Sequence, residues 1–234
     1  MIIKKLSIII PVFNEEKTIE ETINRVFNQT LNNWQKEIIV VDDGSTDRTR
    51  KILNSLKIKF SFVLMCHEKN SGKGAAIKTA LNKVSGEYVI IQDADLEYSS
   101  TDWPQLLKNL DDPKVQIIFG SRELHPQRRG YAMCIWGVRF LTALTNICFG
   151  SNLTDIYTCY KIIPSQTLKS FRLKSPGFEI EAEITSKALR NGMVISEAPI
   201  NYCPRSFKNG KKIRFHDGLS GAWTIIKVCF FKFY

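Results

Sequence analysis

The sequence lacks the paired cysteines that mark many metal-binding and disulfide-rich proteins. Its six cysteines are scattered, at positions 66, 134, 148, 159, 203 and 229, and none forms a C-x-x-C pair. Such pairs are typical of structural zinc sites, and regularly spaced cysteines are typical of disulfide frameworks. We therefore expect no zinc site. We expect the cysteines to be free thiols and the protein to lie in a reducing, cytosolic compartment.

Three further absences narrow the class of protein. The apolar run near the N-terminus ends at Pro11 and no small-residue cleavage site follows it, so we expect no signal peptide. No G-x-G-x-x-G follows a predicted strand, and Gly72-Lys73-Gly74 lacks the spacing of a P-loop. These absences count against a secreted protein, a dinucleotide-dependent oxidoreductase and a P-loop NTPase.

Acidic residues are scarce in the second part of the chain. Residues 1–120 contain 16 Lys and Arg and 16 Asp and Glu, whereas residues 121–234 contain 17 and 7. The whole formal net charge of +10 therefore lies in the second part. This charge suits phosphate-bearing substrates, an anionic membrane surface or nucleic acid. We expect no nucleic-acid partner, because the sequence has no recognised nucleic-acid motif.

Short apolar runs alternate with helical patterns in the first part of the chain. Strands are predicted at residues 6–12, 37–41, 60–65, 88–93 and 115–119, and helices at 15–29, at 75–84 and from a cap at Ser45 or Thr46 to Lys57. This alternation favours an α/β fold with a mostly parallel central sheet flanked by helices. At 234 residues, the chain fits one large domain or one domain with an extension.

Polar residues follow several of the predicted strands, where open parallel sheets bind their ligands. They are Pro11, Asn14 and Glu15 after the first strand, Asp42 and Asp43 after the second, and Asp93 and Asp95 after the fourth. If the chain stays extended beyond the fourth strand, Asp93, Asp95 and Glu97 project from one face. Three carboxylates on one face repel one another, and a hard cation such as Mg²⁺ or Mn²⁺ would relieve that repulsion.

Four motifs in the first part together resemble the family 2 glycosyltransferases, which have the GT-A fold. They are Ile8–Glu15 (I-I-I-P-V-F-N-E), Val40–Asp47 (V-V-D-D-G-S-T-D), Gly72–Gly74 and Gln92–Asp95 (Q-D-A-D). The resemblance implies a nucleotide diphosphate sugar as donor, bound by Pro11, Asn14, Glu15, Asp42, Asp43, Lys73 and Asp93. It also implies Mg²⁺ or Mn²⁺ at Asp93 and Asp95, and we add Glu97 as a third ligand.

The second part of the chain narrows this resemblance to the polyprenyl-phosphate sugar synthases, which act on dolichol phosphate or undecaprenyl phosphate. The motifs are Phe119–Arg122, Thr154–Lys161, Gly177–Glu181 and the stretch from Pro204 to Ile213. One residue departs from the mannose synthases, which commonly have Gln where this chain has Glu97. The resemblance implies inverting, metal-dependent transfer of a hexose, from UDP-glucose or a related UDP-sugar, to a polyprenyl phosphate.

The same resemblance implies different roles for the two parts of the chain. Residues 1–120 are expected to bind the nucleotide sugar, and residues 121–234 the acceptor and the membrane surface, within a single GT-A domain. The resemblance implies that Arg122 and Arg205 hold the acceptor phosphate, with Arg139 and Lys212 as further candidates. Arginine suits this role because it offers a planar fork of donors to phosphate. Asp95, Arg122 and Arg205 are the expected catalytic residues.

Two apolar stretches, at residues 131–149 and 219–234, bear on the membrane. Arg139 interrupts the first, and Lys227 and Lys232 punctuate the second, so neither is typical of a membrane-spanning helix. They fit interfacial helices or ordinary core helices. We expect a peripheral protein on the cytosolic face of a membrane, without a transmembrane helix.

One alternative keeps the chemistry and changes the acceptor to a hydroxyl of a glycan or a protein. A hydroxyl acceptor would need a carboxylate base, with Asp155 or Glu179 as candidates. Asp155 has other possible roles, because it could orient an arginine, bind sugar hydroxyls or cap a turn.

Overall fold

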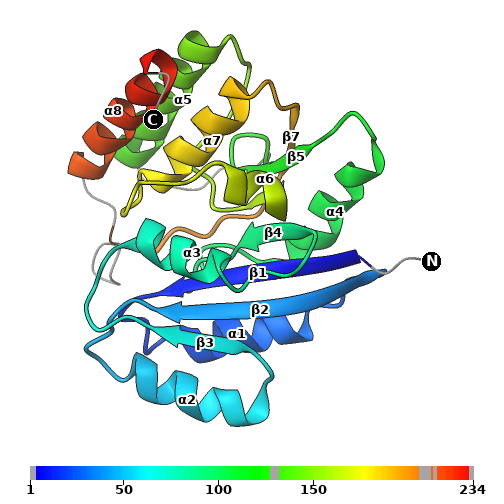
Figure 1. Cartoon of the computed structure of the whole chain (residues 1–234), viewed down its shortest axis with the longest axis vertical. Coiled ribbons are helices and arrows are strands. Elements are labelled where there is room, and N and C mark those ends of the chain that lie inside the picture. The colour runs from blue at the N-terminus through cyan, green and yellow to red at the C-terminus, as the bar shows by residue number, and fades with distance from the viewer. Residues whose placement is uncertain (1–3, 127–131, 206–211, 213–214, 232–234) are drawn as a thin grey trace.

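A computed structural model describes residues 4–126, 132–205, 212 and 215–231, and the statements below concern these residues (Figure 1). The chain forms, in order, β1 (Lys4–Val12), α1 (Ile19–Asn28), β2 (Trp34–Asp42), α2 (Thr49–Lys59), β3 (Val63–Cys66), α3 (Lys73–Leu81), β4 (Tyr88–Ile91), η1 (Ser100–Asp102), α4 (Trp103–Lys108), η2 (Asn109–Asp111), β5 (Ile117–Ser121), α5 (Ala132–Phe149), β6 (Lys161–Pro164), α6 (Ser165–Ser170), α7 (Ile180–Arg190), β7 (Ile195–Pro199) and α8 (Phe215–Phe230).

The strands form one seven-stranded sheet in the order β3-β2-β1-β4-β6-β5-β7. The pairs β3–β2, β2–β1, β1–β4 and β5–β7 are parallel, whereas β6 runs antiparallel to both β4 and β5. The prediction of an α/β fold with a mostly parallel sheet is confirmed. Strands from both parts of the chain belong to this sheet, and β6 joins them.

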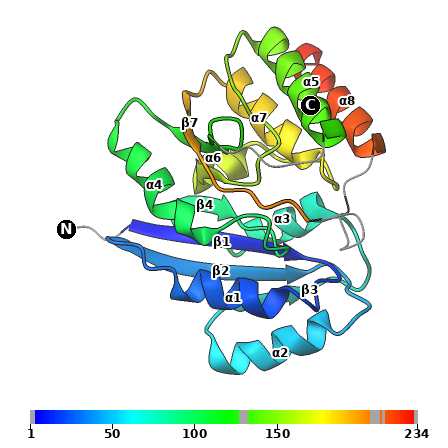
Figure 2. The same cartoon turned by 180° about the vertical axis from the view of Figure 1, so that it is seen from behind.

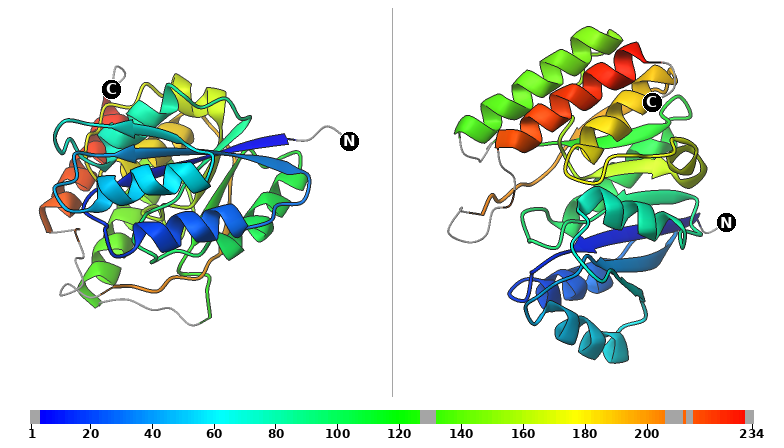
Figure 3. Two further views of the ribbon diagram at one scale, coloured as in Figure 1. Left: turned by 90° about the horizontal axis from the view of Figure 1, so that it is seen from below. Right: turned by 60° about the vertical axis from the view of Figure 1, so that its left-hand side comes forward.

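Alternation along the strands builds a core on each face of the sheet. Ile8 and Ile10 of β1 pack with α1, α2 and α4 on one face, while Ile9 packs with α3, α5, α7 and α8 on the other. Figures 2 and 3 show α1 and α2 together on one side of β1 and β2, and α5 and α8 side by side at the far end.

The predicted elements of the first part are confirmed, with shifted ends. Helix α1 begins at Ile19 rather than at residue 15, and its buried face includes Ile23 and Val26, as the spacing predicts. The predicted cap of α2 is wrong: the helix begins at Thr49, and the Ser45 hydroxyl instead accepts a hydrogen bond from the Asn14 amide at 3.0 Å. Elements β6, β7, α4, α6 and α7 were not predicted.

Residues 132–149 of the first apolar stretch form α5, and residues 219–230 of the second belong to α8; residues 131 and 232–234 lie outside the described residues. The two helices pack against each other (Figure 3). Each helix carries an exposed apolar face with the spacing i, i+4, i+11: Trp136, Phe140 and Ile147 in α5, and Leu219, Trp223 and Phe230 in α8. No helix within the described residues is long and apolar enough to cross a membrane.

The carboxylate of Glu37 in β2 gives a prediction on stability at acid pH. The Glu37 carboxylate accepts hydrogen bonds from the Ser7 and Ser85 hydroxyls, both at 2.5 Å, and lies 2.9 Å from the Lys5 ammonium. Burial works to raise the pKa of Glu37, but the hydrogen bonds outweigh it and lower the pKa to about 2. A lowered pKa stabilises the fold above the unfolded value of about 4.3, and this contribution is lost as the pH falls through about 2.

We therefore expect Glu37→Gln to lower the free energy of unfolding at pH 7 by about 1–3 kcal/mol. The deficit should shrink at pH 3, and urea unfolding at the two pH values measures both. Glu21→Gln is the control, because Glu21 forms only an exposed pair with Arg25 and should cost less than about 0.5 kcal/mol. An equal deficit for Glu37→Gln at both pH values would contradict the assignment.

Candidate active site

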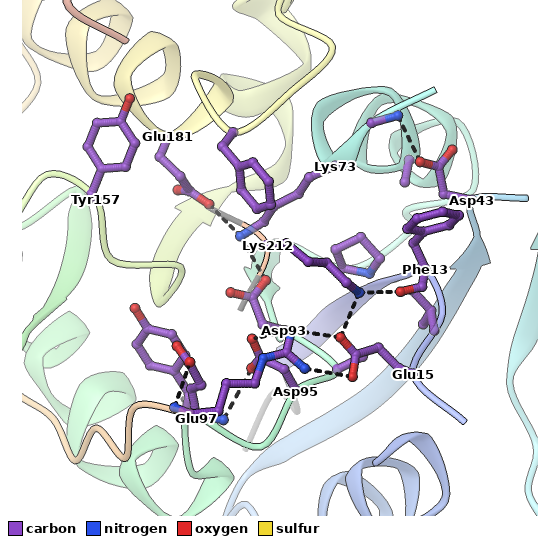
Figure 4. Close-up of a pocket in the computed structure, with 18 of the residues that line it drawn as sticks. Phe13, Glu15, Asp43, Lys73, Asp93, Asp95, Glu97, Tyr157, Glu181 and Lys212 are labelled. Carbon is purple, nitrogen blue, oxygen red and sulfur yellow. Dashed lines mark hydrogen bonds and ion pairs between the residues drawn. The ribbon is translucent and has the colours of Figure 1, made fainter. Parts of the chain in front are cut away.

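A cavity of about 300 Å³ lies where β1, β2 and β4 end (Figure 4). Its walls include most of the residues singled out by the sequence: Pro11, Glu15, Asp43, Lys73, Asp93, Asp95, Glu97, Arg122, Arg205 and Lys212. Parallel strands end at one edge of the sheet, so the loops after them share one site. Asn14, Asp42 and Arg139 do not line this cavity.

The three carboxylates after β4 are not arranged as an extended strand. β4 ends at Ile91, and Leu96 has a left-handed backbone with φ 62°, so the prediction that alternation alone aligns the carboxylates is wrong. Glu97 turns to the segment near Tyr202: its carboxylate accepts hydrogen bonds from the Tyr202 hydroxyl at 2.5 Å and from the Arg205 amide at 2.9 Å.

Asp93 and Asp95 both face the cavity (Figure 4), and their charge is only partly balanced. Burial, Asp93 and Glu97 raise the pKa of Asp95 to about 7, although the Arg205 guanidinium, 3.5 Å away, opposes the rise. The described residues contain no group of three or more His, Cys, Asp or Glu side chains that could hold a metal ion. Two carboxylates nevertheless suit Mg²⁺, which usually takes one or two from the protein and the rest from phosphates and water.

Lys73 connects Asp93 to the second part of the chain. Its ammonium lies 2.7 Å from Asp93 Oδ1 and 3.0 Å from Glu181 Oε1 (Figure 4). Lys73 is the first residue of α3, and Gly72, with φ 98°, precedes it. A side chain at Gly72 would collide with the carbonyl oxygen of Pro176, so only glycine lets the two backbones approach this closely.

The Glu15 carboxylate binds two cationic side chains from the second part of the chain. Its carboxylate accepts two hydrogen bonds from Arg205, at 2.8 and 2.9 Å, and one from Lys212 at 2.7 Å. Burial works to raise the pKa of Glu15, but the bonds from Arg205 and Lys212 outweigh it and hold the pKa below its ordinary value. Glu15, predicted to bind the donor, thus also holds the cations that were predicted to bind the acceptor. The rest of the motif from Pro204 to Ile213 lies largely outside the described residues.

Asp42, the last residue of β2, and Asp43, the residue after it, hold neighbouring segments in place together with Asn14. Asp43 accepts hydrogen bonds from the Ser71 amide at 3.0 Å and the Gly72 amide at 2.7 Å, so it fixes the turn that leads to Lys73. Asp42 is fully buried and pairs with Arg50 at 2.6 Å. The Asn14 side chain accepts a hydrogen bond from the Thr46 amide at 2.8 Å, which ties the loop after β1 to the turn after β2.

Arg122 enters the cavity from the end of β5, and Asp155 orients it. The guanidinium forms a two-pronged pair with the Asp155 carboxylate, at 2.6 and 2.8 Å, and lies 5.0 Å above the Tyr202 ring. The reading of Asp155 as a residue that orients an arginine is thereby confirmed. Arg139 instead pairs with Glu123 at 3.1 Å and is half exposed. Glu179 is the residue before α7, where its carboxylate accepts a bond from the Gly177 amide at 3.0 Å.

Sequence reasoning assigned no role to three contributors to this site, although Lys161 and Glu181 stand in motifs that it quoted. Tyr202 supports Arg122 and Glu97, as described above. Glu181 and Lys161 form a buried ion pair of 2.5 Å behind Lys73. A charged residue inside an apolar run was the available signal for Lys161, which is followed directly by Ile162 and Ile163 in β6.

Comparison with known proteins identifies the family. The model of the family described as glycosyl transferase family 2 matches residues 7–170 of this chain. The chain belongs to glycosyl transferase family 2. It is therefore a transferase of sugars, and its Asp93 and Asp95 lie within the matched region.

Two curated relatives cover most of the chain. The dolichyl-phosphate beta-glucosyltransferase of Trichomonas vaginalis is 27% identical to it, over 97% of this chain and 73% of the relative. The UDP-N-acetylglucosamine–dolichyl-phosphate N-acetylglucosaminyltransferase of Methanococcus voltae is also 27% identical, over 90% of this chain and 91% of the relative.

Solved structures establish the fold of this family 2 transferase. Glucosyl-3-phosphoglycerate synthase of Mycobacterium tuberculosis, in complex with Mn²⁺, UDP and glucosyl-3-phosphoglycerate, matches with a TM-score of 0.73 and 21% identity. The match covers 97% of this chain and 80% of that chain. The same enzyme has also been solved with Mg²⁺ and UDP. The predicted GT-A fold is confirmed.

Proposed function

We propose that this family 2 transferase moves a hexose from a nucleotide diphosphate sugar, UDP-glucose or a related UDP-sugar, to a polyprenyl phosphate, with inversion at the anomeric carbon. Two curated relatives that cover most of the chain carry dolichyl-phosphate transferase names. UDP with Mn²⁺ or Mg²⁺ in a structure of the same fold supports the choice of donor and metal.

One cavity carries this proposal, because four cations line it together with the two carboxylates assigned to the metal. Asp93 and Asp95 lie in the same cavity as Lys73, Arg122, Arg205 and Lys212. Both reactants carry phosphate, so the site must bring two anions together against their repulsion. The cations reduce that repulsion, and correct positioning of the two reactants then supplies much of the rate.

Asp93 and Asp95 are the residues that would hold Mg²⁺ or Mn²⁺, which neutralises charge on a departing diphosphate when it is bound. Lys73, fixed beside Asp93, faces the same end of the cavity and is assigned to the donor. Pro11, Glu15 and Asp43 line the cavity at the ends of β1 and β2. We assign the nucleoside to these residues.

Arg122 and Arg205 are assigned to the acceptor phosphate. Arg122 is oriented by Asp155 and Arg205 by Glu15, so the guanidinium groups are already placed before an anion enters. A phosphate monoester has a second pKa of about 6, so the attacking oxygen is ionised at neutral pH and needs no dedicated base. A hydroxyl acceptor would need one, and Arg122 already occupies both carboxylate oxygens of Asp155.

A product-partition experiment tests this function. The purified chain is incubated with labelled UDP-sugars and GDP-sugars and with dolichyl or undecaprenyl phosphate, with and without EDTA. We expect label in the organic phase from a UDP-sugar, and its loss with EDTA. Label found in a water-soluble glycan or a protein would show that the acceptor is not the lipid, and transfer from GDP-sugars alone would show that the donor is not a UDP-sugar. Transfer that persists in EDTA would contradict the metal dependence.

We also propose that α5 and α8 rest on the cytosolic face of a membrane. Their exposed aromatic residues lie beside cations: the Arg139 guanidinium is 5.6 Å from the Trp136 ring, and the Lys227 ammonium is 5.2 Å from the Trp223 ring. Aromatic rings next to long cationic side chains suit the headgroup layer of an anionic bilayer. A protein held there meets a lipid phosphate without leaving the surface.

Vesicle flotation tests this surface. With vesicles of 30% phosphatidylglycerol, we expect the double variant Trp136→Ser, Trp223→Ser to bind about tenfold more weakly than wild type, because two aromatic side chains no longer enter the interface. Ile58→Ser is the control, since Ile58 is 89% exposed but belongs to α2 on the other side of the sheet. Equal binding of the double variant, or burial of this face in a dimer in solution, would contradict the proposal.

A further inference from the structure

Beside the cavity, four charged side chains of alternating sign form a continuous chain. Lys161 pairs with Glu181 at 2.5 Å, Glu181 lies 3.0 Å from Lys73, and Lys73 lies 2.7 Å from Asp93. These residues come from β6, α7, α3 and the loop after β4, so the chain links both parts of the sequence. Asp93, Lys73 and Glu181 line the cavity, although the Glu181 side chain is only 3% exposed, and Lys161 lies behind them with a fully buried side chain.

Glu181 is well suited to stay ionised in this position. It lies in the first turn of α7, where the helix dipole favours a carboxylate. Burial works to raise its pKa, but the charges of Lys161 and Lys73 outweigh burial and hold the pKa below its ordinary value. One of its oxygens faces Lys161 and the other faces Lys73, so the single carboxylate connects the buried lysine to the one in the cavity.

The contact between Glu181 and Lys73 is an ion pair. The Lys73 ammonium lies 3.0 Å from Glu181 Oε1, and its charge helps to hold the pKa of Glu181 below its ordinary value. A glutamine at this position would keep the shape of the side chain but lose this attraction. The backbone of Lys73 is fixed independently, because the amide of Ala75 donates to the Pro176 carbonyl at 3.0 Å. What Glu181 determines is where the ammonium lies.

We propose that Glu181 is a positioning residue for the donor: backed by Lys161, it holds the Lys73 ammonium beside Asp93, where it meets the diphosphate. This inference rests on the proposed function, because it takes Lys73 as a donor-binding residue. Glu181 itself acts through Lys73. With the carboxylate neutralised, the ammonium is no longer held between two anions, and donor binding weakens.

A double-mutant cycle on UDP affinity tests this role. UDP binding is measured by calorimetry in Mg²⁺ for wild type, Glu181→Gln, Lys73→Met and the variant that carries both changes. We expect Glu181→Gln to weaken UDP binding about tenfold in the wild-type background and less than twofold in the Lys73→Met background. In transfer assays, the KM for the donor should rise more than kcat falls.

Glu183→Gln is the matched control. Glu183 is also buried, lies on the same helix and pairs with Lys187 at 2.6 Å, but it does not line the cavity. Both substitutions should lower the melting temperature, and only Glu181→Gln should change UDP affinity. If Glu181→Gln does not fold, the double variant Lys161→Met, Glu181→Gln removes both buried charges and tests the same loss.

The possible failures are distinguishable. Wild-type affinity in Glu181→Gln, or an equal loss in the Lys73→Met background, would overturn the positioning role while the proposed function stands. An equal loss of UDP affinity in Glu183→Gln would show a merely structural effect and overturn it too. If the wild-type chain binds neither UDP nor GDP, the proposed function fails first, and this inference fails with it.

Discussion

Asp95→Asn should reduce sugar transfer by about 10³-fold while leaving the fold intact. Asp95 faces the cavity beside Asp93 and is assigned to the metal, and loss of a metal ligand removes several kcal/mol of stabilisation from the transition state. The carboxylate contributes little to the fold, because its nearest cation, Arg205, lies 3.5 Å away. Steady-state transfer with saturating Mn²⁺ and thermal unfolding measure the two effects.

The stability of Asp95→Asn should depend on pH in a defined direction. In metal-free protein, burial, Asp93 and Glu97 raise the pKa of Asp95 to about 7, above the unfolded value of about 3.9. Because the folded pKa of Asp95 is raised, the free energy of unfolding of the wild type falls as the pH rises from about 4 to 7. The Asp95→Asn variant lacks this loss, so its free energy of unfolding should increase relative to wild type across that range. Asp111→Asn, which changes an exposed carboxylate, is the control and should alter neither quantity. Normal turnover of Asp95→Asn in saturating metal would remove the metal assignment.

Asp155→Ala should lower the free energy of unfolding by about 3–5 kcal/mol. Asp155 is 1% exposed and forms a two-pronged pair with Arg122, whose guanidinium would be left in the interior without an anion. Breaking a buried pair by removing one partner costs this much because an uncompensated buried charge remains. Urea unfolding at pH 7 measures the loss, and transfer activity should fall with it because Arg122 loses its orientation.

The pair of Arg139 with Glu123 offers a comparison near the same strand. The Arg139 side chain is about half exposed, so Arg139→Ala should change the free energy of unfolding by less than about 1 kcal/mol. A cost below about 1 kcal/mol for Asp155→Ala would show that Arg122 finds another partner or water. A large cost for Arg139→Ala would show that its pair is stronger than its exposure indicates.

The sequence predicted the site where a general rule of parallel sheets applies. Glu15, Asp43 and Asp93 lie far apart in the sequence, yet each follows a strand that ends at the same edge, and all three line one cavity. The rule does not say which way each side chain turns. Asn14 and Asp42, neighbours of Glu15 and Asp43, turn away from the cavity and hold loops instead.

The remaining parts of the site depend on contacts that a single sequence does not encode locally. The alternation argument for Asp93, Asp95 and Glu97 failed because the backbone leaves the extended region before Leu96. Lys161 and Glu181 are 20 residues apart and meet only when α7 packs on the sheet. Both residues stand in motifs that the sequence analysis quoted, but only the fold shows that their charges form a buried pair.

The backbone at Gly72 lies unusually close to the backbone at Pro176. Gly74 meets the carbonyl of Ser175 much as Gly72 meets that of Pro176, so both glycines of the triplet face the loop before α7. The absence of a side chain at the two glycines thus lets a neighbouring segment of the chain pack closely against them. The backbone of Lys73, which lies between them, is therefore held against the loop before α7. This packing keeps the Lys73 ammonium between Asp93 from the first part of the chain and Glu181 from the second.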